Sequence, residues 1–107
     1  MTARLSTHVL DTAGGRPARG VEVGLYGAAA RDLRKRVATD DDGRAVLGES
    51  LAPGVYELVF EVGAYFGTGP TGFLDEVVVR FTIGEGESKC HVPLLISPYG
   101  YTTYRGS

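Results

Sequence analysis

A strand pattern is plainest in the stretch Val55-Tyr56-Glu57-Leu58-Val59-Phe60-Glu61-Val62. Aromatic and aliphatic side chains fill every second position of this stretch, and both glutamates fall on the opposite set of positions. Successive side chains of a β-strand point to opposite faces, so a period of two is typical of a strand that buries one face. The stretch therefore predicts a half-buried strand.

The same alternation recurs on both sides of this stretch. It is present over residues 21–25 and over residues 77–83, which are rich in the β-branched side chains that favour strands. Turn-forming residues separate such segments at Asp11–Gly20, Asp40–Gly43, Ala52–Gly54, Gly84–Glu87 and Ser97–Gly100. The Asp-Gly pair at 42–43 predicts a hairpin between two short strands. This spacing predicts an all-β antiparallel sandwich of about seven or eight strands.

Helix is scarce in the sequence. Ala28–Lys35 contains good helix formers but is short, and Gly63–Gly69 could be a single helical turn or a loop. Neither segment is long enough to be a stable helix by itself. The chain has 107 residues, with no internal repeat and no linker, so we expect residues 1–107 to form a single domain.

Composition narrows the class of protein. Hydrophobic residues make up 43% and charged residues 22%, which is typical of a globular domain. The net charge of −2 gives no general electrostatic reason to expect nucleic-acid binding. No apolar run is long enough to span a membrane, and the N-terminus lacks the apolar segment of a signal peptide. With Cys90 as the one cysteine, we expect a cytoplasmic protein in a reducing compartment.

The two histidines, His8 and His91, are the side chains most suited to acid-base chemistry near neutral pH. By parity, His8 shares a strand face with Ser6 and Leu10. His91 shares one with Pro93 and Leu95, opposite the more apolar face that we expect in the core. An apolar outer face beside His91 implies that a subunit or a ligand covers it. Two unrelated surface histidines remain an open alternative.

Several common sites are poorly supported. A structural zinc site would need three or four ligands, and the sequence has no Cys-x-x-Cys or His-Glu-x-x-His. It also lacks the Gly-x-Ser-x-Gly turn of many serine hydrolases and a phosphate-binding glycine loop. The final segment is rich in tyrosine, which predicts that it packs against the core or an interface instead of fraying.

Taken together, these motifs resemble the 5-hydroxyisourate hydrolases, the transthyretin-related enzymes of urate breakdown. The resemblance runs in order along nearly the whole chain. It rests on Leu5-Ser6-Thr7-His8-Val9-Leu10-Asp11, Gly15-Arg16-Pro17-Ala18, Gly20-Val21, Thr39-x-x-Asp42-Gly43-Arg44, Gly63-Ala64-Tyr65-Phe66, His91-Val92-Pro93-Leu94-Leu95, Ser97-Pro98-Tyr99-Gly100-Tyr101 and Tyr104-Arg105-Gly106-Ser107.

The resemblance implies a transthyretin-like (prealbumin-like) antiparallel β-sandwich of about eight strands with one short helix. It also implies a homotetramer, a dimer of dimers, whose central channel would cover the outer face around His91. The implied reaction is hydrolysis of 5-hydroxyisourate to 2-oxo-4-hydroxy-4-carboxy-5-ureidoimidazoline, with no cofactor and no metal. The implied catalytic residues are His8, Arg44, His91 and Ser107, and the implied substrate-binding residues are His8, Arg44 and Tyr104.

The chemistry of such a reaction suggests roles for these residues. Either His91 or His8 would take a proton from the attacking water, and the other would orient the water or shuttle the proton. Arg44 would hold the carbonyl oxygen as it becomes negative, because a guanidinium stays charged. Tyr104 would bind the ring or its oxygens, and Ser107 would form a hydrogen bond to substrate or water.

Two positions depart from the family pattern. Lys89 stands where the family often has a second histidine, and Asp75 stands where it often has proline. Lys89 could alter the charge of the site. Two other classes of function stay open: a transthyretin-like carrier that binds a ligand without turnover, and a structural sandwich module of a cell-surface protein.

Overall fold

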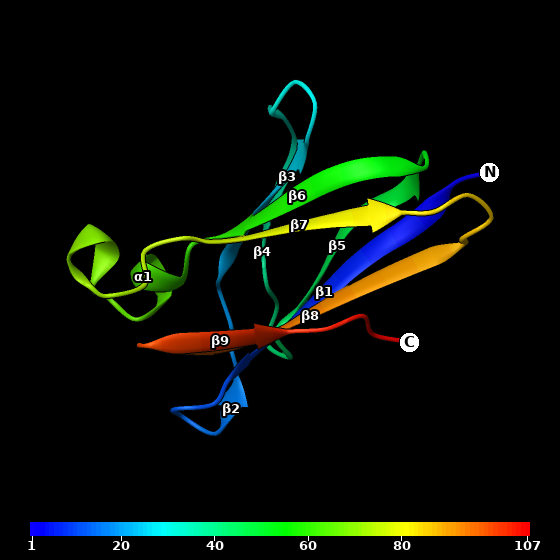
Figure 1. Ribbon diagram of the computed structural model, residues 1–107. Coiled ribbons are helices and arrows are strands. Elements are labelled where there is room, and N and C mark those ends of the chain that lie inside the picture. The colour runs from blue at the N-terminus through cyan, green and yellow to red at the C-terminus, as the bar shows by residue number, and fades with distance from the viewer.

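Two β-sheets face each other in the computed structural model, which describes residues 1–107 (Figure 1). The first sheet contains β1 (Ala3–Asp11), β2 (Arg16–Pro17), β5 (Arg44–Leu51), β8 (Lys89–Ser97) and β9 (Gly100–Thr103). The second contains β3 (Glu22–Gly27), β4 (Asp32–Ala38), β6 (Gly54–Phe60) and β7 (Val77–Ile83). The two-sheet β-sandwich expected from the sequence is confirmed, with nine strands where about eight were expected.

The helical content is small and lies in one connection. Helix α1 (Val62–Tyr65) and a single 3₁₀ turn (Gly69–Thr71) both lie between β6 and β7. In Figure 1, α1 lies at the far end of the molecule from the N-terminus. No helix has the length and apolar character that crossing a bilayer requires. Of the two alternatives left open for Gly63–Gly69, a helical turn or a loop, its first residues form the helical turn, which begins one residue earlier at Val62.

Strand β1 is central to the first sheet. It pairs antiparallel with β5 and β2 along one edge and parallel with β8 along the other, and β9 then pairs antiparallel with β8. The parallel register runs without a break from Arg4 opposite Lys89 to Asp11 opposite Ile96. The sandwich is thus antiparallel except for this pair. Parallel neighbours need a crossover, and here the chain passes through the second sheet between β1 and β8.

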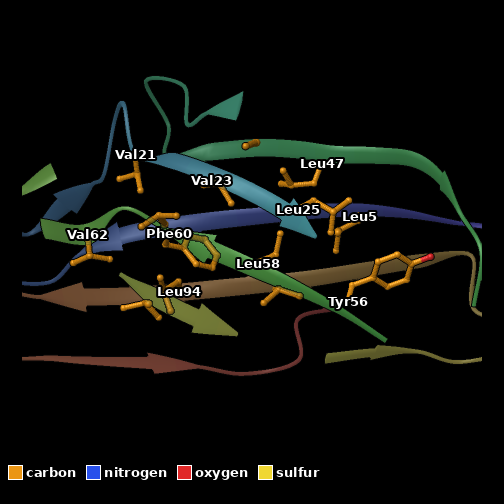
Figure 2. Packing of buried hydrophobic residues seen from close by; sticks show 14 of the residues in the cluster. Leu5, Val21, Val23, Leu25, Leu47, Tyr56, Leu58, Phe60, Val62 and Leu94 are labelled. Atoms are coloured by element: carbon orange, nitrogen blue, oxygen red, sulfur yellow. The ribbon is translucent and has the colours of Figure 1, made fainter. Parts of the chain in front are cut away.

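The core lies between the two sheets and contains 18 buried residues (Figure 2). Alternate side chains of each strand supply it, as the period of two requires. Leu5 and Val9 come from β1, and Leu94 comes from β8. Leu58 and Phe60 enter from β6 with no exposed surface. The inner faces of both sheets therefore form the core, and a functional site has to lie on an outer face or at an edge.

The central stretch of the sequence differs from its prediction in two ways. Strand β6 ends at Phe60, and Val62 begins α1 while staying buried. The outer positions Glu57 and Val59 are also buried, so β6 is covered on both faces. The Glu57 carboxylate lies 3.4 Å from Arg31 and 3.3 Å from Arg80. A central strand between two neighbours loses exposure on its outer face to the long side chains of those neighbours.

The segment Ala28–Lys35, judged too short for a stable helix, forms none: residues 28–31 are a turn and Asp32 begins β4. One local prediction needs correction. The Asp40–Gly43 turn forms, but it does not close a hairpin within one sheet: β4 pairs with β3, and β5 pairs with β1. Gly43 has a φ of 77°, and its backbone lies against β1. The Gly43 carbonyl oxygen accepts a hydrogen bond from the backbone amide of Val9 at 2.7 Å. The turn therefore carries the chain from one sheet to the other.

Candidate active site

The outer face of the first sheet brings three segments together at its centre. On β1, buried residues alternate with the partly exposed Ser6 and His8. The parallel register sets Ser6 opposite His91 on β8, and the antiparallel register sets His8 opposite Arg44 on β5. The prediction that His91 points away from the sandwich interior is confirmed. Three segments distant in sequence thus place two imidazoles and a guanidinium on one surface.

His91 is held by a direct contact across the sheet. Its Nδ1 lies 2.8 Å from the hydroxyl oxygen of Ser6. The hydroxyl can donate or accept in this bond, so the contact fixes the ring without imposing one tautomer. Because Nδ1 is occupied, Nε2 is the ring nitrogen left for other partners.

His8 is held in a different way, by the turn that precedes β5. Its Nε2 donates to the main-chain carbonyl oxygen of Asp42 at 2.8 Å. A carbonyl can only accept, so Nε2 carries the proton and the lone pair of the neutral ring lies on Nδ1. The Asp40 carboxylate accepts from the backbone amides of Asp42 and Arg44, both at 2.9 Å, and so stabilises the turn. The same turn therefore positions His8 and Arg44.

The protonation of His91 is biased towards the neutral form. Burial lowers the pKa of His91 below its ordinary value of 6.5, and electrostatic interaction with His8 and with the Arg44 guanidinium lowers it further. A hydrogen bond to the Ser6 backbone acts in the opposite direction but is the smallest of these influences. A neutral imidazole has a free lone pair and can accept a proton, as a general base must.

A cavity of about 270 Å³ opens beside this imidazole. His91, Ser6 and Arg44 line it together with Ser107 from the end of the described chain. The remaining lining residues are Arg4, Lys89 and Cys90. A neighbouring hollow of about 450 Å³ shares Arg4, Ser6, Arg44 and His91 and extends towards Val37 and Asp40.

Cationic groups dominate the charge of this cavity. Arg4 forms an ion pair with Glu49 at 3.0 Å, whereas Arg44 and Lys89 have no carboxylate within ion-pair distance. Two uncompensated positive charges favour a ligand that is anionic or that develops negative charge. Lys89 lies in the wall of this cavity. No group of three or more His, Cys, Asp or Glu side chains is placed to hold a metal ion.

The predicted site residues divide into two groups in the structure. His91, Arg44 and Ser107 line one cavity, and His8 is the register neighbour of Arg44 on the same face. Tyr104 instead lines a different, mostly apolar cavity of about 280 Å³ beneath β7, and its side chain is 58% exposed. His91 lines both cavities.

Two contributors were not singled out as site residues by the sequence analysis. Ser6 contacts His91, and the Asp42 carbonyl holds His8. Parity placed Ser6 on the face of His8, but only the parallel pairing of β1 with β8 sets it opposite His91. A main-chain carbonyl leaves no signal in a side-chain pattern, so the sequence alone could not reveal the role of Asp42.

Comparison with known proteins gives a consistent result along the whole chain. The HIUase/Transthyretin family model matches residues 5–106. The 5-hydroxyisourate hydrolase 2 of Rhizobium meliloti is 49% identical, over 99% of this chain and 98% of its own. The structure of Klebsiella pneumoniae 5-hydroxyisourate hydrolase superimposes with a TM-score of 0.85 at 35% identity, covering 98% of this chain and 94% of that one.

Transthyretin itself is a more distant match. The transthyretin structure from Sparus aurata has a TM-score of 0.81 at 29% identity and covers 95% of both chains. The fold is thus shared with both branches of the family, while sequence identity is higher with the hydrolases. The residues that carried the resemblance lie within the matched region except for Ser107, which follows it directly, and the chain belongs to the HIUase/Transthyretin family.

Proposed function

We propose that this chain hydrolyses 5-hydroxyisourate to 2-oxo-4-hydroxy-4-carboxy-5-ureidoimidazoline, a step of urate degradation within purine metabolism. The observation that carries this proposal is the grouping of His91, Arg44 and Ser107 around one cavity, with His8 beside Arg44. The relatives confirm the broader prediction that the chain is a hydrolase.

The reaction needs a base and a site for negative charge. Water adds to a ring amide carbonyl, the carbon–nitrogen bond breaks, and the departing ring nitrogen receives a proton. The new carboxylate keeps the oxygen of the water. Removing the proton of water and stabilising the tetrahedral oxyanion each lower the barrier, and a positioned base typically contributes about 10²–10⁴-fold.

His91 is the base that the geometry favours. When its Nδ1–H donates to the Ser6 hydroxyl, Nε2 has a free lone pair at the cavity. The lowered pKa keeps that lone pair available at neutral pH. His8 would act through Nδ1, since its Nε2 donates to the Asp42 carbonyl, and it would orient the water or carry the proton to the leaving nitrogen.

Arg44, Ser107 and Tyr104 complete the proposed site. Arg44 has no carboxylate partner, so its guanidinium is free to hold the carbonyl oxygen as charge develops. Ser107, which lines the same cavity, would donate or accept a hydrogen bond with substrate or water. Tyr104 would contact the ring from the neighbouring cavity that His91 also lines.

The proposal extends to assembly and location. A homotetramer, built as a dimer of dimers in the cytoplasm, would cover the outer face on which His91 lies and would shield the cavity from bulk water. Exposed apolar side chains on the edge strands and loops, such as Val78, Tyr99 and Tyr101, are available for such contacts.

A ligand carrier is the second candidate, because the transthyretin superposition is close. A carrier would bind a small molecule without turnover. The experiment is to generate 5-hydroxyisourate freshly from urate, follow its ultraviolet decay, and identify the product by NMR. Decay faster than the spontaneous rate, with the ring-opened carboxylate as product, is the expected result. Tight binding with unchanged decay would instead identify a carrier.

A further inference from the structure

The segment that follows β9 lies directly against the proposed base. Gly106 forms an isolated antiparallel bridge with His91, and its amide donates to the His91 carbonyl oxygen at 2.9 Å. A Cβ built on Gly106 would lie 2.5 Å from Cδ2 of the His91 ring and 3.1 Å from its Cγ. The backbone of this segment therefore packs on the imidazole, and no larger residue fits there without moving the ring.

One ion pair fastens this segment to the rest of the chain. Nη2 of Arg105 lies 3.0 Å from Oε1 of Glu87, which belongs to the loop between β7 and β8. The Glu87 side chain is only 24% exposed, so its carboxylate is partly shielded from water, although Arg105 is 77% exposed. Exposed ion pairs contribute little to the stability of a fold as a whole. Here, however, the pair acts on a short segment that has few other contacts.

We propose that this ion pair, the Glu87–Arg105 latch, positions His91 and Ser107 for catalysis. This proposal rests on the proposed function. With the latch closed, Gly106 presses on the His91 ring from one side while Ser6 holds Nδ1 from another. The same segment delivers Ser107 to the wall of the cavity that holds Arg44. Glu87 and Arg105 line the neighbouring cavity beside Tyr104, but the proposed mechanism gives them no contact with the reacting atoms, so they are positioning residues.

The consequence is a division between binding and chemistry. When the latch opens, residues 105–107 leave His91, so the ring gains freedom and Ser107 leaves the cavity. Tyr104 stays beside β9, where the Thr103 hydroxyl donates to the Pro93 carbonyl oxygen at 2.7 Å. Arg44 and His8 are held by the Asp40 turn and stay in place. Misplacement of reacting groups by about 1 Å can cost about 10²-fold in rate. Loss of the latch is therefore expected to lower kcat much more than it raises KM.

The test uses the full chain and neutral variants on each side of the latch, Glu87→Gln and Arg105→Gln. The matched control is Asp32→Asn, which removes an ion pair of the same length, 3.0 Å, between Asp32 and Arg34 on β4. We expect kcat to fall about tenfold in both latch variants, with KM changed less than twofold and the control unaffected. Arg105→Lys, which keeps the charge, should recover most of the rate.

A second measurement does not depend on turnover. The ring resonances of His91, followed by NMR with His8 as internal reference, should broaden or shift in Glu87→Gln and Arg105→Gln but not in Asp32→Asn. Gly106→Ala should shift them with the latch intact, because its Cβ would overlap the ring. The reversed pair, Glu87→Arg with Arg105→Glu, should restore the wild-type spectrum and rate.

Different results would contradict the latch proposal and the proposed hydrolase function. Absence of turnover by the wild-type chain would contradict the proposed function. The NMR shifts of the His91 ring would still show whether the latch positions that ring. Normal turnover in both latch variants, with unchanged His91 resonances, would overturn the latch. A loss of rate that coincides with a change in subunit assembly, measured by light scattering, would also overturn it, since the ion pair would then act through assembly.

Discussion

The hydroxyl of Ser6 lies 2.8 Å from Nδ1 of His91, across the parallel pairing of β1 with β8. This bond joins residues from opposite ends of the chain and fixes the imidazole ring at the cavity. In enzymes that use histidine, the partner of one ring nitrogen fixes the direction in which the other nitrogen points. Ser6 is therefore expected to matter to the reaction although it need not touch the substrate.

The first prediction concerns that hydroxyl. Ser6→Ala should lower kcat by about tenfold, because the ring loses the partner that keeps Nε2 as the free nitrogen. The matched control is Thr12→Ala, which also removes a hydroxyl hydrogen bond near β1 but lies away from the cavity. Steady-state rates of 5-hydroxyisourate decay provide the measurement. Equal rates for the two variants would show that Ser6 has no part in positioning His91.

The second prediction concerns the pKa of His91. Burial lowers it first, and electrostatic interaction with His8 and with the Arg44 guanidinium lowers it further. Arg44→Gln removes one positive charge, so the pKa of His91 should rise towards its ordinary value, while Arg44→Lys should leave it low. NMR titration of the ring gives this value without requiring activity. An unchanged titration in Arg44→Gln would mean that Arg44 is too distant to act on the imidazole.

The lowered pKa also sets the direction of the pH dependence of activity. The neutral base persists below pH 6.5 and is lost only as the pH falls through the lowered folded-state value. The pH at which activity falls to half on the acid side should therefore be lower than the pKa of a free imidazole. In the same window the unfolded chain binds the proton more readily, so this group makes the fold less stable as the pH falls.

The third prediction concerns the carboxyl group of Glu61, which lies between β6 and α1. Burial raises the pKa of Glu61 above 4.5, and the neighbouring Glu76 and Asp75 raise it further. A raised folded-state pKa means that stability is lost as the pH rises from 4.5 through that value. Glu61→Gln should therefore gain stability over wild type between pH 4.5 and 7. Urea unfolding at both pH values tests this, with the exposed loop variant Glu85→Gln as control.

The fourth prediction concerns the core. Phe60 is fully buried between the sheets, whereas Phe73 is 74% exposed in the connection to β7. Phe60→Ala should lower the free energy of unfolding by about 3–5 kcal/mol, because it removes buried apolar surface and leaves a cavity. Phe73→Ala should change it by less than about 0.5 kcal/mol. Urea midpoints at one fixed subunit concentration provide the measurement. Similar losses for both variants would contradict the assigned core.

The fold was predictable where local pattern alone determines structure. Alternation over residues 77–83 matches β7 from end to end, and the Ser97–Gly100 turn joins β8 to β9 as a hairpin. Pairing between distant segments was not predictable. The Asp-Gly turn predicted a hairpin, but the strands on either side join different sheets, because the face that each must bury decides its neighbours.

The sequence named candidate site residues but could not predict how they are arranged. The family resemblance named His8, Arg44, His91 and Ser107, and the structure places all four on one face of the first sheet or at its edge. Tyr104 lies instead beside a neighbouring cavity. The path of residues 104–107 depends on long-range contacts with Glu87 and His91, which no local pattern reveals.

The most direct test of the central claim compares wild type with His91→Ala on freshly generated 5-hydroxyisourate at neutral pH. Ultraviolet decay is followed against the spontaneous rate, and circular dichroism and light scattering confirm that the variant keeps its fold and assembly. The account predicts strong acceleration by the wild type and a loss of about 10²–10⁴-fold in His91→Ala. Undiminished acceleration by a folded His91→Ala variant would contradict it.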